Sequence, residues 1–315
     1  MNGTALVTGA GGFVGSNLVR ALIAQNIPVH IIWKRSTDPW RLNDIKNRLT
    51  FHATDLLDKR SLRRLVKKLA PDFIFHLASF GAYAQQTDCA KMEEVNIRGT
   101  RHLLESTVDL PYRVLVHTGS SSEYGFKDHP MKESDVLAPV SYYAITKATA
   151  THLCQMAAKT FHKPIVVLRP FSVYGSYEEG ERLIPTAIEA IRHKKNIRLT
   201  PGHQRRDFVY VDDVVGAYLK AIEHAAAIAG HVINIGTGTQ STNDEVVRTL
   251  FTVAGQTVEV EKGGFPARSW DTSHWVADIS RAARLLGWKP AYTLERGLSK
   301  TFQWFQTHSS LYEKD

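Results

Sequence analysis

The chain has little cysteine, with only Cys89 and Cys154 among its 315 residues. Two thiols are too few for a disulfide framework, and they fit a protein kept in reduced form. Cys-x-x-Cys and His-x-x-x-His pairs are also missing from the sequence, although it contains 14 histidines. Because protein metal centres commonly draw their ligands from such spacings, we expect no metal site.

Long apolar runs are missing as well, since no window offers about 18 uninterrupted apolar residues. We therefore expect no membrane span. Met1 leads directly into the apolar residues 5–7, without the basic region, long apolar core and small-residue cleavage site of a signal peptide. This start predicts a cytoplasmic protein.

Acidic residues are fewer than basic ones, 31 against 39, which leaves a formal net charge of +8. The basic residues are spread along the chain, and no basic segment is interleaved with aromatic residues in the manner of a nucleic-acid-binding protein. Small anionic ligands, such as a dinucleotide phosphate or a diphosphate sugar, explain the excess equally well. A merely solvated basic surface remains the alternative for most of these residues.

Short apolar runs alternate with amphipathic stretches over the first two thirds of the chain, which predicts an α/β fold with a doubly wound parallel sheet. We expect strands at 5–8, 29–33, 49–53, 73–77, 114–118 and 165–169, and helices at 14–25, 58–69, 91–107 and 142–161. Further on, 205–222 predicts a strand leading into a helix, 258–261 a strand, and 242–254 and 280–286 helices. The expected domains are residues 1–168 plus 207–237, which carry the sheet, and a smaller interleaved lobe, residues 169–206 plus 238–315.

Gly9, Gly12 and Gly15 form a Gly-x-x-Gly-x-x-Gly turn directly after the first expected strand and at the start of a helix. Glycines at these positions permit a tight turn, close approach of the backbone to a phosphate, and close packing of helix on strand. In this context the motif predicts a dinucleotide-binding site. We expect further cofactor contacts from Phe13, Val14, Leu56, Leu77 and Ala78.

The end of the second expected strand predicts which dinucleotide is bound. A carboxylate there would bind the adenosine ribose of NAD, but the residues present are Trp33, Lys34 and Arg35. Two cations and no acid favour a 2'-phosphate, so we expect NADP(H) rather than NAD. The alternative is that Lys34 and Arg35 are solvated loop charges. Asp55, after the third strand, is expected either to accept a bond from the adenine amino group or to cap the following helix.

Tyr143 and Lys147 lie one helical turn apart and face the same side of an expected helix. An ammonium group there stabilises a phenolate and brings its pKa, ordinarily about 10, towards neutrality. Ser120 follows the fifth expected strand, at the edge of the sheet where ligands bind in such folds. The three side chains predict a redox site with Tyr143 as general acid or base. An exposed lysine beside a core tyrosine is the structural alternative.

Longer segments extend these motifs along the chain, and they comprise Thr8 to Ser16, His76 to Ala78, Asn96 to Thr100, Arg169 to Gly175, Arg206 to Val214 and Leu286 to Pro290. With them the chain resembles an extended short-chain dehydrogenase/reductase of the nucleotide-sugar epimerase/dehydratase family over nearly its whole length. This resemblance implies an NADP-binding Rossmann domain and a lobe that binds a nucleotide sugar.

The resemblance also implies individual roles. In the family the catalytic Ser or Thr lies four residues before a Tyr-Gly pair, which here selects Ser120, while Tyr143 and Lys147 take the other two catalytic places. The expected substrate-binding residues are Ser121, Ser122, Ser172, Arg206, Arg268 and Asp271. Among these, the two arginines match phosphate-binding positions, Asp271 matches the acid that holds the nucleotide ribose, and Ser172 replaces an asparagine near the diphosphate. A surface ion pair is the alternative for each arginine.

Departures from the family pattern help to choose the reaction. Family 4,6-dehydratases have an Asp-Glu pair where this chain has Ser121 and Ser122. Glu123 comes one residue late, and in an extended segment its side chain points to the opposite face. Elimination chemistry is therefore disfavoured.

These observations predict NADP(H)-dependent reduction of a nucleotide-linked 4-keto-6-deoxyhexose at C4, in which Tyr143 protonates the nascent alkoxide. Residues 178–185 resemble the corresponding segment of NADP-using reductases of this kind. The alternative is a nucleotide-sugar 4-epimerase, and a more remote one is a non-catalytic NADP-binding sensor. The family also implies a homodimer formed through the helices at 91–107 and 142–161.

Overall fold

A parallel sheet forms the centre of the protein in the computed structural model, which describes residues 2–34, 37–199, 204–263 and 272–312. Within these residues the sheet has seven strands in the order β11-β6-β5-β4-β1-β2-β3. Their bounds are β1 Ala5–Thr8, β2 Val29–Trp33, β3 Leu49–Ala53, β4 Phe73–His76, β5 Val114–Thr118, β6 Ile165–Pro170 and β11 Val232–Ile235. All pairings are parallel. The predicted doubly wound α/β fold is confirmed.

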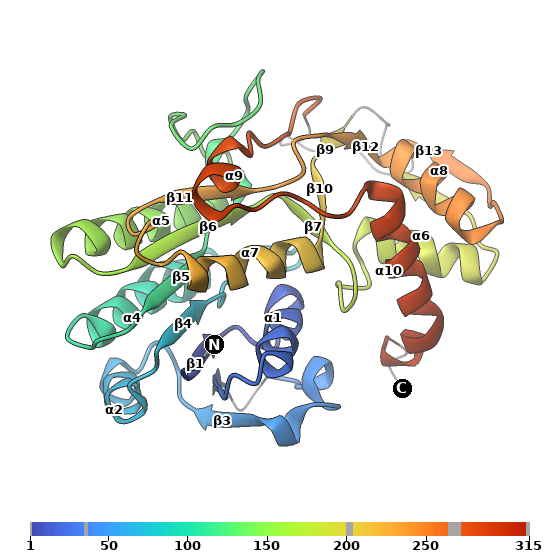
Figure 1. Cartoon of the computed structure of the whole chain (residues 1–315). Coiled ribbons are helices and arrows are strands. Elements are labelled where there is room, and N and C mark those ends of the chain that lie inside the picture. The colour runs from blue at the N-terminus through green and yellow to red at the C-terminus, as the bar shows by residue number, and fades with distance from the viewer. Residues whose placement is uncertain (1, 35–36, 200–203, 264–271, 313–315) are drawn as a thin grey trace.

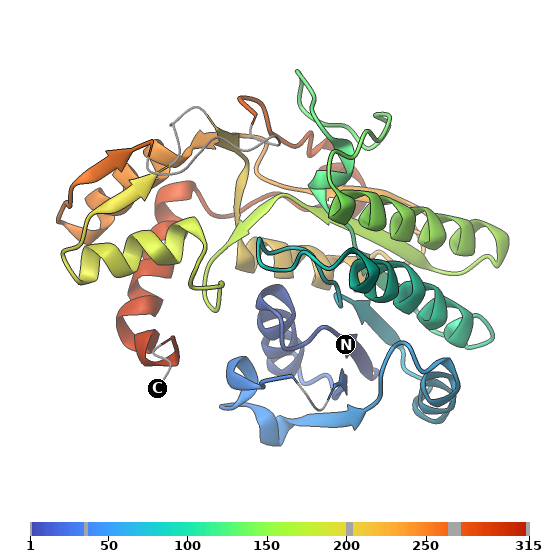
Figure 2. The same ribbon diagram turned by 180° about the vertical axis from the view of Figure 1, so that it is seen from behind.

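Helices cover both faces of the sheet (Figures 1 and 2). Helices α1 (Phe13–Ala24) and α7 (Val211–Glu223) contact each other on one face, whereas α2 (Lys59–Leu69), α4 (Thr100–Thr107) and α5 (Tyr142–Thr160) pack together on the other. A short helix α3 (Cys89–Met92) and a π-helical segment η3 (Glu93–Gly99) lead into α4. Since helices cover both sides, the residues of β1, β4 and β5 are almost all buried, and most of them are apolar.

A second lobe packs beside the carboxyl ends of the strands (Figure 1). Its helices are α6 (Leu183–Arg192), α8 (Asn243–Ala254) and α10 (Leu294–His308), which contact one another, and α9 (Ser280–Leu286) packs near β11. Its short strands pair as β7 (Ser172–Tyr174) with β10 (Phe208–Tyr210), β8 (Ile197–Leu199) with β13 (Val260–Lys262), and β9 (Arg205–Arg206) with β12 (Ser241–Thr242). Single-turn 3-10 helices are η1 (Trp40–Leu42), η2 (Lys46–Arg48), η4 (Ser121–Tyr124) and η5 (Ser309–Leu311). The predicted division between two domains stays a prediction.

Local capping explains several helix ends. Asp58 accepts a hydrogen bond from the Ser61 N–H at the start of α2, and Ser141 accepts one from Ala144 at the start of α5. Helix α9 ends at Gly287, whose φ of 58° lies in the left-handed region that glycine favours. That end is the one predicted from the sequence.

Strand β11 is an edge of the sheet, with β6 as its one neighbour. Two charged side chains bind the backbone groups that β11 turns away from β6. Glu133 accepts a hydrogen bond from the Asn234 N–H (2.9 Å), and Arg281 donates to the Val232 carbonyl (3.1 Å). The same two side chains form an ion pair at 3.4 Å. The polar edge of the sheet is therefore satisfied by side chains.

Candidate active site

The glycine turn lies where β1 ends and α1 begins. Gly9 has a φ of +72°, and a Cβ there would lie 2.5 Å from the Ala78 nitrogen, so the turn packs directly on the segment after β4. A Cβ on Gly15 would lie 2.2 Å from the Gly9 carbonyl oxygen. Both positions therefore require glycine, and Leu77 and Ala78 lie beside the turn as expected for cofactor contacts.

The first turn of α1 offers a site for a pyrophosphate. Gly12 occupies the N-cap position, no side chain caps the helix, and its first turn, which includes Phe13 and Val14, contains no acid. Free backbone N–H groups and the positive end of the helix dipole then face the turn. These residues fit a bound dinucleotide, whose phosphates would take the place of a capping side chain.

The ends of β2 and β3 hold the residues predicted to select the cofactor. The Trp33 ring lies over the turn, since a Cβ on Gly11 would come within 2.9 Å of it. Lys34 forms an ion pair with Asp55 (Nζ to Oδ2, 3.2 Å). Asp55 accepts a hydrogen bond from the Leu57 N–H at 2.9 Å, and the cap of α2 is Asp58, so the predicted capping alternative for Asp55 is wrong. Leu56, between them, is buried. Arg35 lies outside the described residues.

Tyr143 and Lys147 occupy the first two turns of α5, behind its Ser141 cap. Burial raises the pKa of Tyr143 to about 12, although its hydrogen bond with Ser120 acts in the opposite direction. The buried Lys147 donates a hydrogen bond to the Thr118 carbonyl (2.6 Å), and burial lowers the pKa of its ammonium to about 8. The expectation that Lys147 brings the Tyr143 pKa towards neutrality is wrong for this conformation, because the ammonium binds a backbone carbonyl of β5 instead.

Ser120 is held by three hydrogen bonds to two residues of its own turn, Ser122 and Glu123. Its side chain caps η4 by accepting from the Ser122 N–H (3.2 Å), and its hydroxyl bonds that of Ser122 at 2.7 Å. The Glu123 carboxylate accepts from the Ser120 N–H at 2.7 Å. The expectation of an extended segment with Glu123 facing away is wrong, because the chain coils into a 3-10 turn that brings Glu123 back towards Ser120. Ser120 thus reaches Tyr143 from a fixed backbone.

Two predicted substrate residues meet at an aromatic side chain that sequence reasoning missed. Ser121 accepts a hydrogen bond from the Trp275 indole nitrogen at 3.1 Å, and the Arg206 guanidinium lies 5.2 Å from the Trp275 ring centroid. Ser172 lies at the start of β7, where its N–H donates to the Asp207 carbonyl. Arg268 and Asp271 fall outside the described residues. Trp275 is thus a candidate wall of the substrate site.

Sequence reasoning also missed a set of charged and polar side chains between the sheet and the second lobe. Arg182 and Tyr83 act on the Tyr143 hydroxyl, since the cation lowers its pKa and the second phenol raises it. Buried Arg41 pairs with Glu179 at 2.8 Å and donates to the Gly11 and Tyr177 carbonyls, which ties the glycine turn to the second lobe. The sequence offered one signal for this group, the acidic run that begins at residue 178.

Two further properties bear on function. No helix within the described ranges is long and apolar enough to cross a membrane. In that same part of the chain, no group of three or more His, Cys, Asp or Glu residues is arranged to hold a metal ion.

Comparison with known proteins identifies similar chains. The sequence model of the NAD dependent epimerase/dehydratase family matches residues 5–236. An uncharacterised UDP-glucose epimerase of Bacillus subtilis is 30% identical, covering 98% of both chains. The UDP-glucuronic acid 4-epimerase of Bacillus cereus, solved with UDP-glucuronic acid and NAD, is 29% identical with a TM-score of 0.84 over 96% of this chain and 99% of its own. The dTDP-glucose 4,6-dehydratase of Bacillus anthracis, solved with NAD, is 26% identical with a TM-score of 0.86, covering 98% and 97%.

Proposed function

Because this chain belongs to the NAD-dependent epimerase/dehydratase family and is an enzyme of nucleotide-sugar chemistry, we propose that it is a 4-epimerase of a UDP-linked hexose. The sequence alone favoured reduction of a 4-keto sugar over epimerisation. The epimerase relatives and the contacts around Ser120 and Lys34 favour epimerisation.

The observation that carries the proposal is a single acid–base group at the reacting carbon. The Ser120 hydroxyl acts on Tyr143, whose pKa it lowers, while Ser121 and Ser122, with no titratable group near neutral pH, occupy the places of the dehydratase acids. Glu123, the acid that follows these serines, is engaged with the Ser120 N–H and with Arg169. Elimination of water from C5 and C6 needs a second proton carrier. One proton carrier suffices to oxidise and re-reduce one carbon.

The residues then act as follows. For Tyr143 to act as the base, binding of the dinucleotide and the sugar must lower its pKa from the value of about 12 in this conformation. Tyr143 then takes the proton of the C4 hydroxyl as hydride leaves C4, and returns the proton when hydride comes back to the opposite face of the keto sugar. A dinucleotide held by Gly9, Gly12 and Gly15 would supply the hydride acceptor and donor for this exchange. Ser120 donates a hydrogen bond to the C4 oxygen while charge develops there. The substrate phosphates would be bound by Arg206, beside Trp275. General acid–base help of this kind contributes about 100 to 10,000-fold.

We propose NAD, rather than the NADP first expected, as the resident cofactor. Asp55 already pairs with Lys34, so a 2'-phosphate would have to displace a carboxylate from the cation that was expected to bind it. Similar proteins have been solved with NAD. The cofactor released from the purified protein on denaturation, identified by mass spectrometry, tests this assignment.

We also propose a homodimer formed through α5 and its neighbour α4. Ile145 and Met156 lie on one face of α5, three turns apart, and expose 47% and 48% of their surface. Apolar side chains in such a row favour packing of helix on helix. Light scattering of the wild type and of Ile145→Glu tests the interface, because a charge in the row should leave monomers.

The central experiment incubates the purified protein with UDP-glucose, UDP-glucuronic acid and dTDP-glucose, without added cofactor, and separates the products by anion-exchange chromatography. We expect a UDP sugar to convert to its C4 epimer with no net change in cofactor. The Tyr143→Phe variant should lose this conversion, whereas Tyr142→Phe, at the exposed neighbouring position, should keep it.

Three results would contradict the proposal. A 4-keto-6-deoxy product from dTDP-glucose would indicate a dehydratase. Stoichiometric loss of NADPH with a 4-keto sugar would indicate the reductase first expected. Cofactor binding without conversion of any sugar would indicate a sensor.

A further inference from the structure

A buried ion pair lies directly behind the turn that holds Ser120. Arg169, at the end of β6, donates from Nη2 to Glu123 Oε2 at 2.7 Å, and their side chains expose 2% and 0% of their surface. The guanidinium also lies over the Tyr124 ring, 4.4 Å from its centroid. Burying two charges costs desolvation energy that an apolar pair of similar volume would avoid. A buried pair at this position therefore calls for a reason other than stability.

The contacts of Glu123 supply that reason. Oε2 binds Arg169, and Oε1 accepts the Ser120 N–H at 2.7 Å. The Ser120 side chain caps the same turn from the other end, which completes a capping box. Arg169 thus fixes the carboxylate, and the carboxylate fixes the backbone from which the Ser120 hydroxyl reaches Tyr143.

We propose that Glu123 and Arg169 form a positioning pair that holds Ser120 in place for proton transfer at Tyr143. Neither side chain touches the reacting atoms, since both are buried behind η4. The effect on proton transfer rests on the proposed function. The effect on the position of the Ser120 backbone does not depend on which reaction is catalysed.

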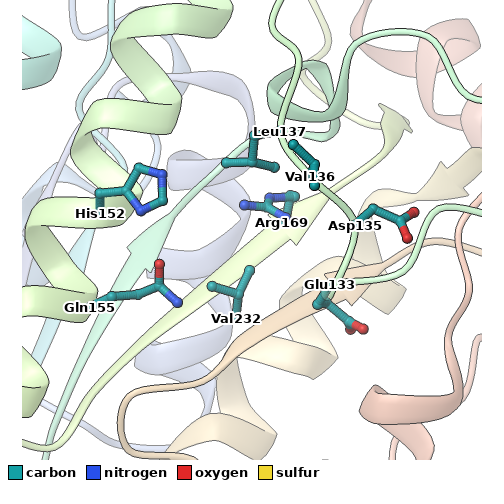
Figure 3. Close-up of a pocket in the computed structure, with 8 residues that line it drawn as sticks. All are labelled: Glu133, Asp135, Val136, Leu137, His152, Gln155, Arg169 and Val232. Atoms are coloured by element: carbon teal, nitrogen blue, oxygen red, sulfur yellow. The ribbon is translucent and has the colours of Figure 1, made fainter.

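The far side of Arg169 faces a pocket of about 440 Å³ (Figure 3). Its lining comes from α5, β6, β11 and residues 133–137, and comprises Glu133, Asp135, Val136, Leu137, His152, Gln155, Arg169 and Val232. Within the described residues, Arg169 Nε and Nη1 make no hydrogen bond. Val136 and His152 at the pocket are exposed, so its lining extends to the surface. Once the Arg169 side chain is removed, we expect a small cation to enter its place through this pocket, from outside the active site.

The first test removes the pair without leaving a buried charge. In the double variant Glu123→Leu/Arg169→Met, apolar side chains of similar length fill the same space. We expect kcat to fall about 100-fold with KM for the sugar unchanged, because a displaced Ser120 misplaces the hydrogen bond at the reacting oxygen. A wild-type kcat, or a loss that lies entirely in KM, would overturn the proposal.

The second test uses the pocket for chemical rescue. Arg169→Ala leaves the Glu123 carboxylate in place and opens space for a free guanidinium ion. We expect millimolar guanidinium to restore kcat about tenfold in this variant, because the ion re-forms the charge-assisted bond to Glu123. Equal concentrations of sodium chloride and of urea should restore nothing. Restoration by either control, or none by guanidinium in the folded variant, would overturn the proposal.

A readout that needs no substrate separates the positioning pair from the proposed function. Hydrogen exchange, followed by mass spectrometry of the peptide containing residues 119–125, reports the protection of the Ser120 amide. We expect faster exchange in both variants, and exchange as slow as in the wild type would overturn the positioning role. If the wild type converts no sugar, the epimerase proposal fails while this result still tests the link from Arg169 to Ser120.

Discussion

Replacement of the buried Glu178 should change the pH dependence of stability strongly. Glu178 lies in the turn after β7, exposes 5% of its surface, and one of its carboxylate oxygens makes no hydrogen bond within the described part of the chain. Its ion-pair partner, Arg182, is 4.0 Å away and half exposed. Burial, with a smaller contribution from the charge of Glu179, raises the pKa of Glu178 from 4.5 to about 8.

The sign of the effect follows from proton binding. Between pH 4.5 and about 8 the folded protein keeps the proton of Glu178 whereas the unfolded chain releases it. Folding stability from this group is therefore complete below pH 4.5 and is lost as the pH rises to about 8. Each pH unit between the two pKa values lowers the free energy of unfolding by about 1.4 kcal/mol. The free energy of unfolding therefore falls by about 5 kcal/mol over the whole interval.

Glu178→Gln removes the titration and retains the shape of the neutral acid. Urea unfolding of both proteins, followed by tryptophan fluorescence at a series of pH values, should show the variant gaining several kcal/mol on the wild type between pH 5 and pH 8. Glu181→Gln, at an exposed position of the same loop, serves as the matched control, with an expected change of about 0.5 kcal/mol or less. A wild-type-to-variant difference that does not change with pH would refute the reasoning.

Three further predictions concern the cofactor and the reaction. Tyr143→Phe should lower kcat by about 100 to 10,000-fold and leave dinucleotide binding intact; a loss of binding measured by calorimetry would speak against a purely chemical role. Gly15→Ala places a Cβ 2.2 Å from the Gly9 oxygen, so the purified variant should carry no dinucleotide, and a full complement measured by absorbance would contradict the tight packing. Asp55→Asn frees Lys34 from its ion pair and should raise affinity for NADP relative to NAD; an unchanged ratio of the two Kd values would show that the pair does not govern selection.

Much of the sheet could be predicted because its inner strands are local apolar runs. Strands β1, β2, β3 and β5 have the predicted bounds, and β4 and β6 differ from them by one residue at the carboxyl end. β11 was missed because the polar Asn234 interrupts its apolar run. The Asn234 side chain bonds the Tyr124 hydroxyl and the Met131 carbonyl. Those partners lie about a hundred residues away and leave no local pattern.

Helix α10 was missed for a related reason. Gly297 lies inside it, and a Cβ there would come within 2.0 Å of the Tyr174 hydroxyl oxygen. The glycine that weakens the local helical pattern is required by a strand of the same lobe. The predicted helix at 91–107 forms, but η3 interrupts its α-helical pattern.

In the candidate site, too, the residues indicated by local sequence could be predicted, whereas the contacts between distant residues could not. Tyr143, Lys147 and Ser120 are indicated by spacing and by the ends of strands, which are local properties. The contact of Trp275 with Ser121 joins residues 154 positions apart, and the pairing of Arg169 with Glu123 depends on a 3-10 turn that sequence reasoning took for extended chain. One sequence gives no signal for contacts of that kind.

The two charged side chains bound to the outer edge of β11, Glu133 and Arg281, also affect how copies of this protein can associate. An uncovered edge strand offers free N–H and C=O groups to a strand of another molecule, which is a common start of aggregation. Here Glu133 and Arg281 already occupy the outward groups of Asn234 and Val232. A second copy therefore finds these two groups already bound at the β11 edge, which disfavours growth of the sheet from one molecule into the next on this side.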